Sequence, residues 1–284
     1  MSRQETIVIP SKTDVGALGN RINSETRTCH EKINKEMAIK FPAAIYEPKA
    51  YRQGIQMFYH IFKAIEDSLS QEINKNTHYS AMLRNIWRPE LARTERLHKD
   101  LMFFYNDHPE KFESPILEKQ IQSTQHIRQL ASEKPYLLLA YMHVLYLALF
   151  AGGQFMYPKV AQSPKLFPGS NPKNFQEIAS KGTHFFKFDV ENPQKLRAAY
   201  KQDYELQTRN FLSEQEKQEV IEESKKAFDM ISDGLNEIQS HNLSILRQKA
   251  GLLAYLKSNY LLVALATLII YCIARVFVSG AFLY

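Results

Sequence analysis

Apolar residues recur at intervals of three and four positions along most of the chain, which is the spacing that lets a helix bury one face. We therefore expect an all-α protein, with helices over Leu18–Lys40, Tyr51–Ile73, Pro89–Tyr105, Pro115–Ala131, Pro193–Asn210 and Ser213–Leu246. Pro42 should end the first helix, because its ring interrupts the hydrogen-bond ladder. Ser213 and Glu216 have the spacing of a capping box at the start of the last helix. The Pro-, Ser-, Gly- and Asn-rich stretch Ser163–Asn174 predicts a loop.

Two further stretches are apolar all round. The first covers residues 135–153, where His143 is the only strongly polar side chain. A hydropathy window would accept it as a membrane span, but three tyrosines and the adjacent Gly152 and Gly153 favour the central helix of a bundle.

The second apolar stretch covers residues 260–284 and contains Arg275 as its only charge. It exceeds the about 20 residues that cross a bilayer. Arg247, Lys249 and Lys257 precede it and favour a cytosolic location for the preceding domain. We expect a C-terminal transmembrane tail anchor; the alternative is a buried core helix.

Composition narrows the possible classes of protein. The chain has 284 residues with only 10 Gly, too few turns for a many-stranded sandwich or barrel. Cys29 and Cys272 form neither a disulfide framework nor a four-cysteine zinc site. A net charge of +6 suits an acidic partner protein, an anionic ligand or a membrane surface, and does not by itself indicate nucleic acid. The expected layout is a disordered N-terminus (1–16), a helical domain (17–247), a basic linker (248–259) and the span (260–284).

Candidate chemistry begins with His30, which lies at the edge of an apolar helix face with Arg27 on the rim. An imidazole beside a cation suits a flat, dianionic haem, which needs an iron ligand and partners for its propionates. The alternative is an ordinary boundary histidine.

Two other features are open to two interpretations each. Gly152 and Gly153 give backbone without side chains inside an apolar helix, against which a planar ligand could press; close helix packing or a helix end are the alternatives. Arg197 and Lys201 are four positions apart and share a helix face, so they could clamp an anion or form a solvated basic surface.

Several segments together resemble the haem (heme) oxygenases, and most closely their fungal, membrane-anchored branch. They are TRTCHEKIN (26–34), MFYHIFKAIED (57–67), LARTERLHKDLMFFY (91–105), LLLAYMHVLYLALFAGGQ (137–154), KLRAAYK (195–201) and VIEESKKAF (220–228). The resemblance extends from about residue 18 to residue 238 and implies an all-α domain that holds haem between a proximal helix and a kinked distal helix.

The resemblance also implies the roles of individual residues. His30 would be the axial ligand of the haem iron, and Gly152 and Gly153 would be distal-helix glycines that act in catalysis. The remaining haem-binding residues would be the cations Arg27, Arg197 and Lys201, together with His143 at a propionate, Leu149 on the distal helix and Phe228 in the pocket wall.

The implied activity is oxidative cleavage of haem b, which is both substrate and cofactor, to biliverdin, carbon monoxide and ferrous iron. The reaction uses O2 and electrons from NADPH that a cytochrome reductase delivers. The implied location is the endoplasmic reticulum membrane, with the catalytic domain in the cytosol.

Two positions depart from the family pattern. Leu149 stands where the best-known members have an Asp that orders distal water, and Asn34 stands where a Glu often lies near the proximal histidine. Leu149 leaves open a haem-binding sensor or sink, or a peroxidase-like protein, without efficient oxygenase activity. A tail-anchored helical tether is a remote alternative, suggested by a heptad-like pattern that includes Ile221, Phe228 and Ile231.

Overall fold

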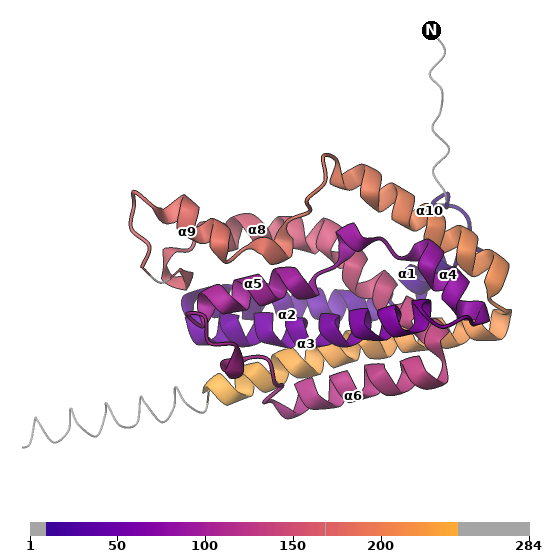
Figure 1. Cartoon of the computed structure of the whole chain (residues 1–284), viewed down its shortest axis with the longest axis horizontal. Coiled ribbons are helices and arrows are strands. Elements are labelled where there is room, and N and C mark those ends of the chain that lie inside the picture. The colour runs from indigo at the N-terminus through magenta and orange to yellow at the C-terminus, as the bar shows by residue number, and fades with distance from the viewer. Residues whose placement is uncertain (1–9, 168, 244–284) are drawn as a thin grey trace, which may run out of the picture. The chain divides into compact units, whose positions relative to one another are not determined.

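A computed structural model describes residues 10–167 and 169–243, and within those ranges every regular element is a helix (Figure 1). The all-α prediction is therefore confirmed. The helices are α1 (Leu18–Glu25), α2 (Arg27–Tyr46), α3 (Pro48–Ile73), α4 (His78–Ile86), α5 (Thr94–Phe104), α6 (Glu118–Glu133), α7 (Leu138–Tyr141), α8 (Gln154–Ala161), α9 (Phe175–Lys181), α10 (Pro193–Phe211) and a last helix over 214–243.

One compact unit extends from Met1 to Ile238, and a second begins at Gln239, of which residues 239–243 are described and helical. The predicted linker (248–259) and membrane span (260–284) lie outside the described residues. Within the predicted N-terminal tail, residues 10–16 form turns, and the Asn20 side-chain amide donates to the main-chain oxygens of Ser11 and Asp14.

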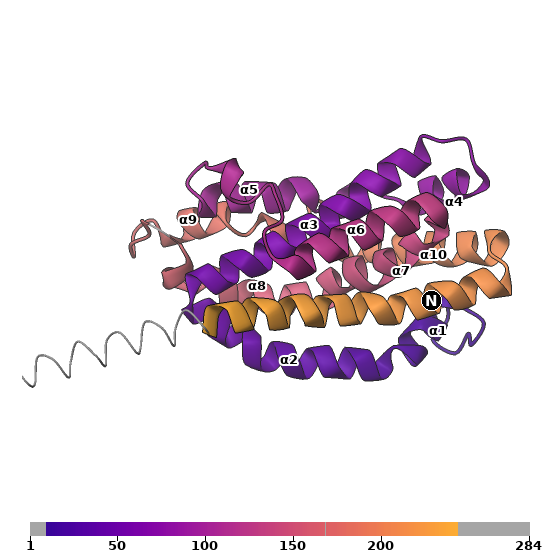
Figure 2. The ribbon, with the colours of Figure 1, turned by 90° about the horizontal axis from the view of Figure 1, so that it is seen from below.

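Helix α3 is the centre of the first unit, because it packs against both α5 and α6 (Figures 1 and 2). Its apolar positions recur at helical spacing, and Ile61, Phe62 and Ile65 are almost completely buried. Helix α2 runs beside the last helix (Figure 2), where Ser232 Oγ donates to Glu36 Oε1 at 2.7 Å and Lys40 Nζ donates to Asn236 Oδ1 at 2.6 Å.

The predicted first helix is in fact two helices. The chain breaks at Thr26, whose hydroxyl donates back to the Ile22 carbonyl, and α2 then continues through Pro42 to Tyr46. The prediction that Pro42 ends the helix was wrong, because Ala44 and Ile45 beyond it pack against the core and offset the lost hydrogen bond.

Other boundaries follow from local capping. Helix α4, which the periodicity did not predict, is short and begins with a capping box between Thr77 and Ser80. The predicted box at the last helix is confirmed: Ser213 N donates to Glu216 Oε2 at 2.7 Å, and Glu216 N donates to Ser213 Oγ at 3.3 Å.

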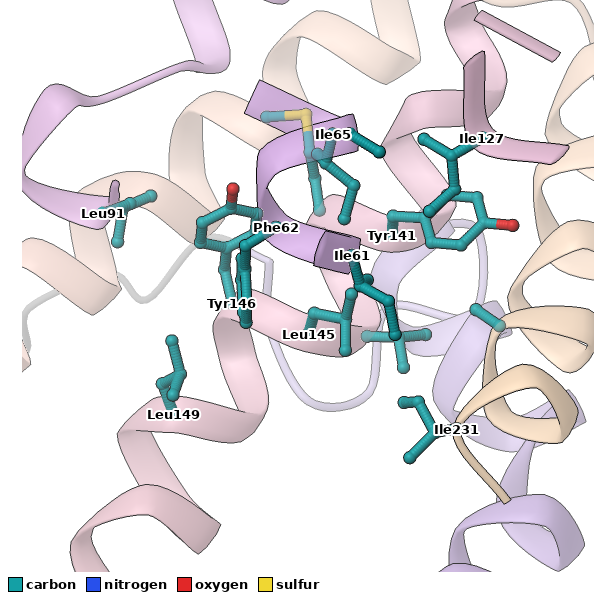
Figure 3. Close-up of a cluster of buried hydrophobic side chains, with 14 of the residues drawn as sticks. Ile61, Phe62, Ile65, Leu91, Ile127, Tyr141, Leu145, Tyr146, Leu149 and Ile231 are labelled. Atoms are coloured by element: carbon teal, nitrogen blue, oxygen red, sulfur yellow. The ribbon is translucent and has the colours of Figure 1, made fainter. Parts of the chain in front are cut away.

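The most apolar described helical stretch, Pro135–Ala161, meets the length and composition of a membrane span, and most of it is buried within the unit. Tyr141, Leu145 and Tyr146 face α3 in the cluster drawn in Figure 3. Two π-helical segments, η4 (Met142–Tyr146) and η5 (Leu149–Gly153), interrupt it. The expectation of a central core helix is therefore confirmed, with an irregularity that the sequence did not predict.

Candidate functional site

The predicted proximal helix, α2, has no fully buried residue, although Ala44 and Ile45 are half-buried against the core. His30 is exposed on it, and its ring meets the half-buried Phe228 edge to face, with centroids 6.1 Å apart. The predicted pair of His30 and Phe228 is therefore brought together. A helix of this length without a fully buried side chain is unusual, because packing of an apolar face supplies most helical stability in proteins.

The tautomer of His30 depends on Asn34, one turn further along α2. Asn34 Nδ2 lies 3.1 Å from His30 Nδ1. In this orientation the amide nitrogen donates to Nδ1, which corresponds to the tautomer with its proton on Nε2. If the Asn34 amide turned by half a rotation, its oxygen would face Nδ1 and accept a hydrogen bond from it. A glutamate at this position would accept in either orientation, because both carboxylate oxygens are acceptors.

The predicted distal helix lies within Pro135–Ala161 and has small exposed residues along one face, next to the exposed Phe155. Ala148, Ala151 and Gly152 are exposed at helical spacing, whereas the buried Leu149 and Gly153 face the core. A Cβ atom added at Gly152 would meet no heavy atom within 4 Å, and one at Gly153 would lie 3.6 Å from Leu149 and 3.8 Å from Phe186. The two glycines therefore differ: Gly153 faces the core, where an added methyl group would make ordinary van der Waals contacts, and Gly152 leaves an open surface.

Leu149 belongs to the core rather than to the exposed face. Its side chain is 5% exposed and belongs to the cluster of buried apolar side chains drawn in Figure 3. A leucine offers no proton donor or acceptor, so this position can order no water through its side chain.

Phe188 and Arg93, which the sequence analysis did not single out as functional, support the predicted distal helix through the contact of Phe188 with Phe150. Phe150 stacks on Phe188 with ring centroids 4.4 Å apart. The Arg93 guanidinium lies 4.3 Å from the centroid of the same Phe188 ring, in a cation–π contact. Arg93 is completely buried and donates to the carbonyls of Phe185 and Lys187 at 3.1 and 2.6 Å. Burial lowers the pKa of the Arg93 guanidinium to about 10, which still leaves it charged at neutral pH.

A pair of cations lies on α10. Arg197 and Lys201 form no ion pair with any described residue, and the buried Nε of Arg197 has no hydrogen-bond partner there. Burial, and then the charge of Arg197, lower the pKa of Lys201. The nearby carboxylate of Glu205, which lines the same cavity as Lys201, pairs with Arg209 instead. Two cations without ion pairs of their own could bind an anionic ligand.

The third predicted cation, Arg27, differs from this pair. Its Nε lies 3.2 Å from Glu31 Oε1, and both side chains are exposed. The charge of Arg27 is therefore already partly balanced on its own helix, although an exposed pair of this kind is weak and can rearrange.

His143 is buried at the start of the distal helix and shares a cavity of about 10 Å³ with Lys201, Gly19 and Tyr204. Its Nε2 lies 3.0 Å from Asn23 Oδ1 and donates to it. Burial, and then the charge of Lys201, lower the pKa of His143 to about 4, so the ring is neutral at physiological pH. The structure thus places His143 beside Lys201, with one nitrogen engaged by α1.

The described contacts group the predicted residues in three places: His30 with Phe228, His143 with Arg197 and Lys201 around α10, and Leu149 with Gly153 on the distal helix. No described contact joins the group around His30 to the glycines. Within residues 10–167 and 169–243, no cluster of three or more His, Cys, Asp or Glu residues could hold a metal ion by itself.

A family model described as Heme oxygenase matches residues 16–237 of the chain. The chain belongs to the haem oxygenase family. It is 36% identical over 248 residues to the heme-binding protein HMX1 of Saccharomyces cerevisiae, which covers 81% of this chain and 77% of that protein. It is 27% identical over 234 residues to the heme oxygenase of Rhodella violacea, which covers 81% of this chain and 90% of that one.

The fold of the haem oxygenases is also found by structural comparison. The crystal structure of heme oxygenase-2 from Synechocystis sp. PCC 6803, in complex with heme and NO, matches with a TM-score of 0.64 at 20% identity, over 79% of this chain and 86% of that one. The resemblance inferred from the ordered segments is confirmed, and the similarity to the yeast protein supports the fungal branch.

Proposed function

We propose that this protein is a haem oxygenase that cleaves haem b to biliverdin, carbon monoxide and ferrous iron. The observation that carries the proposal is the exposed imidazole of His30, on a helix with no fully buried residue, in a chain of this family. O2 and electrons from NADPH, delivered by a cytochrome reductase, would complete the reaction.

Three independent features of the structure fit haem. The open space at Gly152 would admit a flat apolar surface, the unpartnered Nε of Arg197 and the ammonium of Lys201 would bind carboxylates, and His30 would supply a ligand for iron. Phe228 would pack beside that imidazole. Bound haem would supply the iron-centred redox chemistry, which no described residue provides alone.

The proximal residues would set the protonation of the ligand. Nitrogen binds a metal through a lone pair, so Nε2 of His30 would be unprotonated and the ring proton would lie on Nδ1. The Asn34 amide would then turn so that Oδ1 accepts this proton's hydrogen bond. A neutral amide acceptor keeps the imidazole neutral and strengthens its donation less than a carboxylate would.

The other residues would position haem. Arg197 and Lys201 would hold its propionates with charge-assisted hydrogen bonds, His143 would lie beside them, and Arg27 would add charge at the rim. At Gly152 the main chain itself would contact haem and leave room for O2, while Gly153 would face the core beside Phe186.

A second function is favoured by Leu149. Because its buried side chain cannot order water, proton supply to the distal side would depend on other groups, and a haem sensor or sink, or a peroxidase-like protein, is the alternative. The name of the yeast relative states haem binding and no reaction.

We also propose that residues 260–284 anchor the chain by its tail in the lipid bilayer of the endoplasmic reticulum, with the helical domain in the cytosol. Their single charge and their length support this assignment. Deletion of residues 258–284 should release the protein from the membrane fraction, and retention there would refute the anchor.

The reaction can be tested with the full chain in detergent. After addition of one equivalent of haemin, a Soret band should form; NADPH and a cytochrome reductase in air should then convert it to a biliverdin spectrum. His30→Ala should abolish the histidine-type Soret band, whereas His108→Ala, at an exposed histidine on a turn beside Glu110, should not. A stable complex that never yields biliverdin would favour the haem sensor or sink. The lack of any Soret band would refute haem binding and favour the tail-anchored helical tether.

A further inference from the structure

Two tyrosines on α10 are bonded to the main chain of the distal helix. Tyr200 Oη donates to the carbonyl of Met142 at 2.9 Å, and Tyr204 Oη donates to the carbonyl of Leu139 at 3.1 Å. Both side chains are buried, and the two residues lie one turn apart on the helix. Each bond joins positions about sixty residues apart in the chain.

These bonds meet the distal helix where its regular geometry ends. Leu139 lies in α7 and Met142 begins the π-helical segment η4, where the hydrogen-bond pattern changes from i→i+4 to i→i+5. The Tyr204 ring also lies against His143, with centroids 5.4 Å apart. A change of register rotates every following residue about the helix axis, so whatever stabilises η4 also sets the direction in which the helix presents Gly152 and Gly153.

A second hydrogen bond of the same segment leads to α3. Tyr146 Oη donates to Glu66 Oε1 at 3.0 Å, and this carboxylate also accepts from the main-chain N–H groups of Arg93 and Thr94. Hydrogen bonds from two helices therefore hold η4, and π-helical segments are rare enough to need such support.

Helix α10 also carries the two unpartnered cations. Arg197 lies three positions before Tyr200, and Lys201 lies three positions before Tyr204. Tyr200, Lys201 and Tyr204 line the same small cavity as His143. The helix that would hold the haem propionates is thus bonded directly to the helix that would press on the haem face.

We infer that Tyr200 and Tyr204 are positioning residues that fix the register of the distal helix relative to the Arg197–Lys201 pair, and so determine which meso edge of haem faces the open space at Gly152. The role in edge selection rests on the proposed oxygenase function, whereas the role in the register of the helix does not. Neither hydroxyl needs to touch haem.

The test uses Tyr200→Phe, Tyr204→Phe and the double variant of the full chain. The matched control is Tyr51→Phe, because the Tyr51 hydroxyl is buried on α3 and has no hydrogen-bond partner among the described residues. Amide hydrogen exchange of residues 138–153 in the haem-free protein should rise about fivefold for each lost hydroxyl bond, while α6 and the control keep wild-type rates.

The second readout is the distribution of biliverdin isomers. The tyrosine variants should spread the product over more than one meso isomer while their Kd for haemin stays within about twofold of wild type. A merely stabilising role would raise exchange throughout the unit and leave the isomers unchanged, and that result would overturn the inference. Unchanged exchange in residues 138–153 would overturn it as well. Lack of biliverdin from the wild-type chain would instead refute the proposed reaction, and the exchange measurement would still decide the role in the register.

Discussion

The open space at Gly152 leads to a prediction in which stability and ligand affinity change in opposite directions. Gly152→Ala adds one methyl group to η5, where it would meet no protein atom within 4 Å. In the haem-free protein the change therefore creates no clash. Alanine loses less backbone entropy on folding than glycine, so the haem-free variant should gain stability.

The size of each effect can be estimated. The propensity difference between Gly and Ala in a helix is about 1 kcal/mol, which raises Tm by about 2–4 °C in a domain of this size. A ligand pressed against the glycine backbone would lose contact when a methyl group intrudes, and overpacking of this kind costs about 1–3 kcal/mol. The Kd for haemin should therefore rise by a factor of about 5 to about 150.

The assay combines thermal unfolding of the haem-free protein with a haemin titration. Gly54→Ala is the matched control, since a Cβ at Gly54 on α3 also meets nothing within 4 Å. The control should gain similar stability and keep its affinity for haemin. If Gly152→Ala bound haemin as tightly as wild type, haem would not lie against this face; if it lowered Tm, the space at Gly152 would not be open.

Three further predictions concern single side chains. Arg197→Ala should weaken haemin binding about tenfold or more by removing a charge-assisted contact, without destabilising the haem-free protein, whereas Lys195→Ala, exposed on the same helix, should change neither quantity. Arg93→Met should lower the free energy of unfolding by at least about 3 kcal/mol in a denaturant titration, because the buried carbonyl of Phe185 and the half-buried carbonyl of Lys187 lose their donor. A loss below about 1 kcal/mol would contradict the assigned support. His143 has a folded pKa of about 4 against an unfolded value of 6.5, so its contribution to stability is fully present above pH 6.5 and is lost as pH falls toward 4. Chemical unfolding of His143→Gln between pH 7 and 4 should show a weaker dependence on pH than wild type, and an unchanged slope would argue against a buried neutral ring.

Helical periodicity was sufficient to predict the fold class and most helices, because a helix that buries one face needs apolar residues at that spacing whatever its neighbours are. It did not predict that α2 continues through Pro42, since the compensation comes from tertiary packing of Ala44 and Ile45. The π-helical segments were also missed, because an extra residue in the hydrogen-bond ring leaves no mark in a stretch that is apolar all round.

The candidate site was predictable to a similar extent. His30 and Gly152 could be chosen because each residue type is unusual in its surroundings: His30 is a polar ring at the edge of an apolar face, and Gly152 is a glycine inside a helix. The different surroundings of Gly152 and Gly153 depend on tertiary packing, which only coordinates reveal. Arg93 and Tyr200 act through main-chain carbonyls of distant segments, so no local pattern points to their partners.

The absence of fully buried residues in α2 also bears on how long the protein survives in a cell. Segments with few buried apolar contacts open locally at low free energy, and such openings expose the backbone to proteases. A ligand that binds the closed state opposes this opening by mass action, worth about 2.7 kcal/mol when its free concentration is one hundred times its Kd. If haem covers α2, as the proposed function requires, the amount of this protein would therefore increase with the supply of haem and fall as haem is depleted, with no change in gene expression.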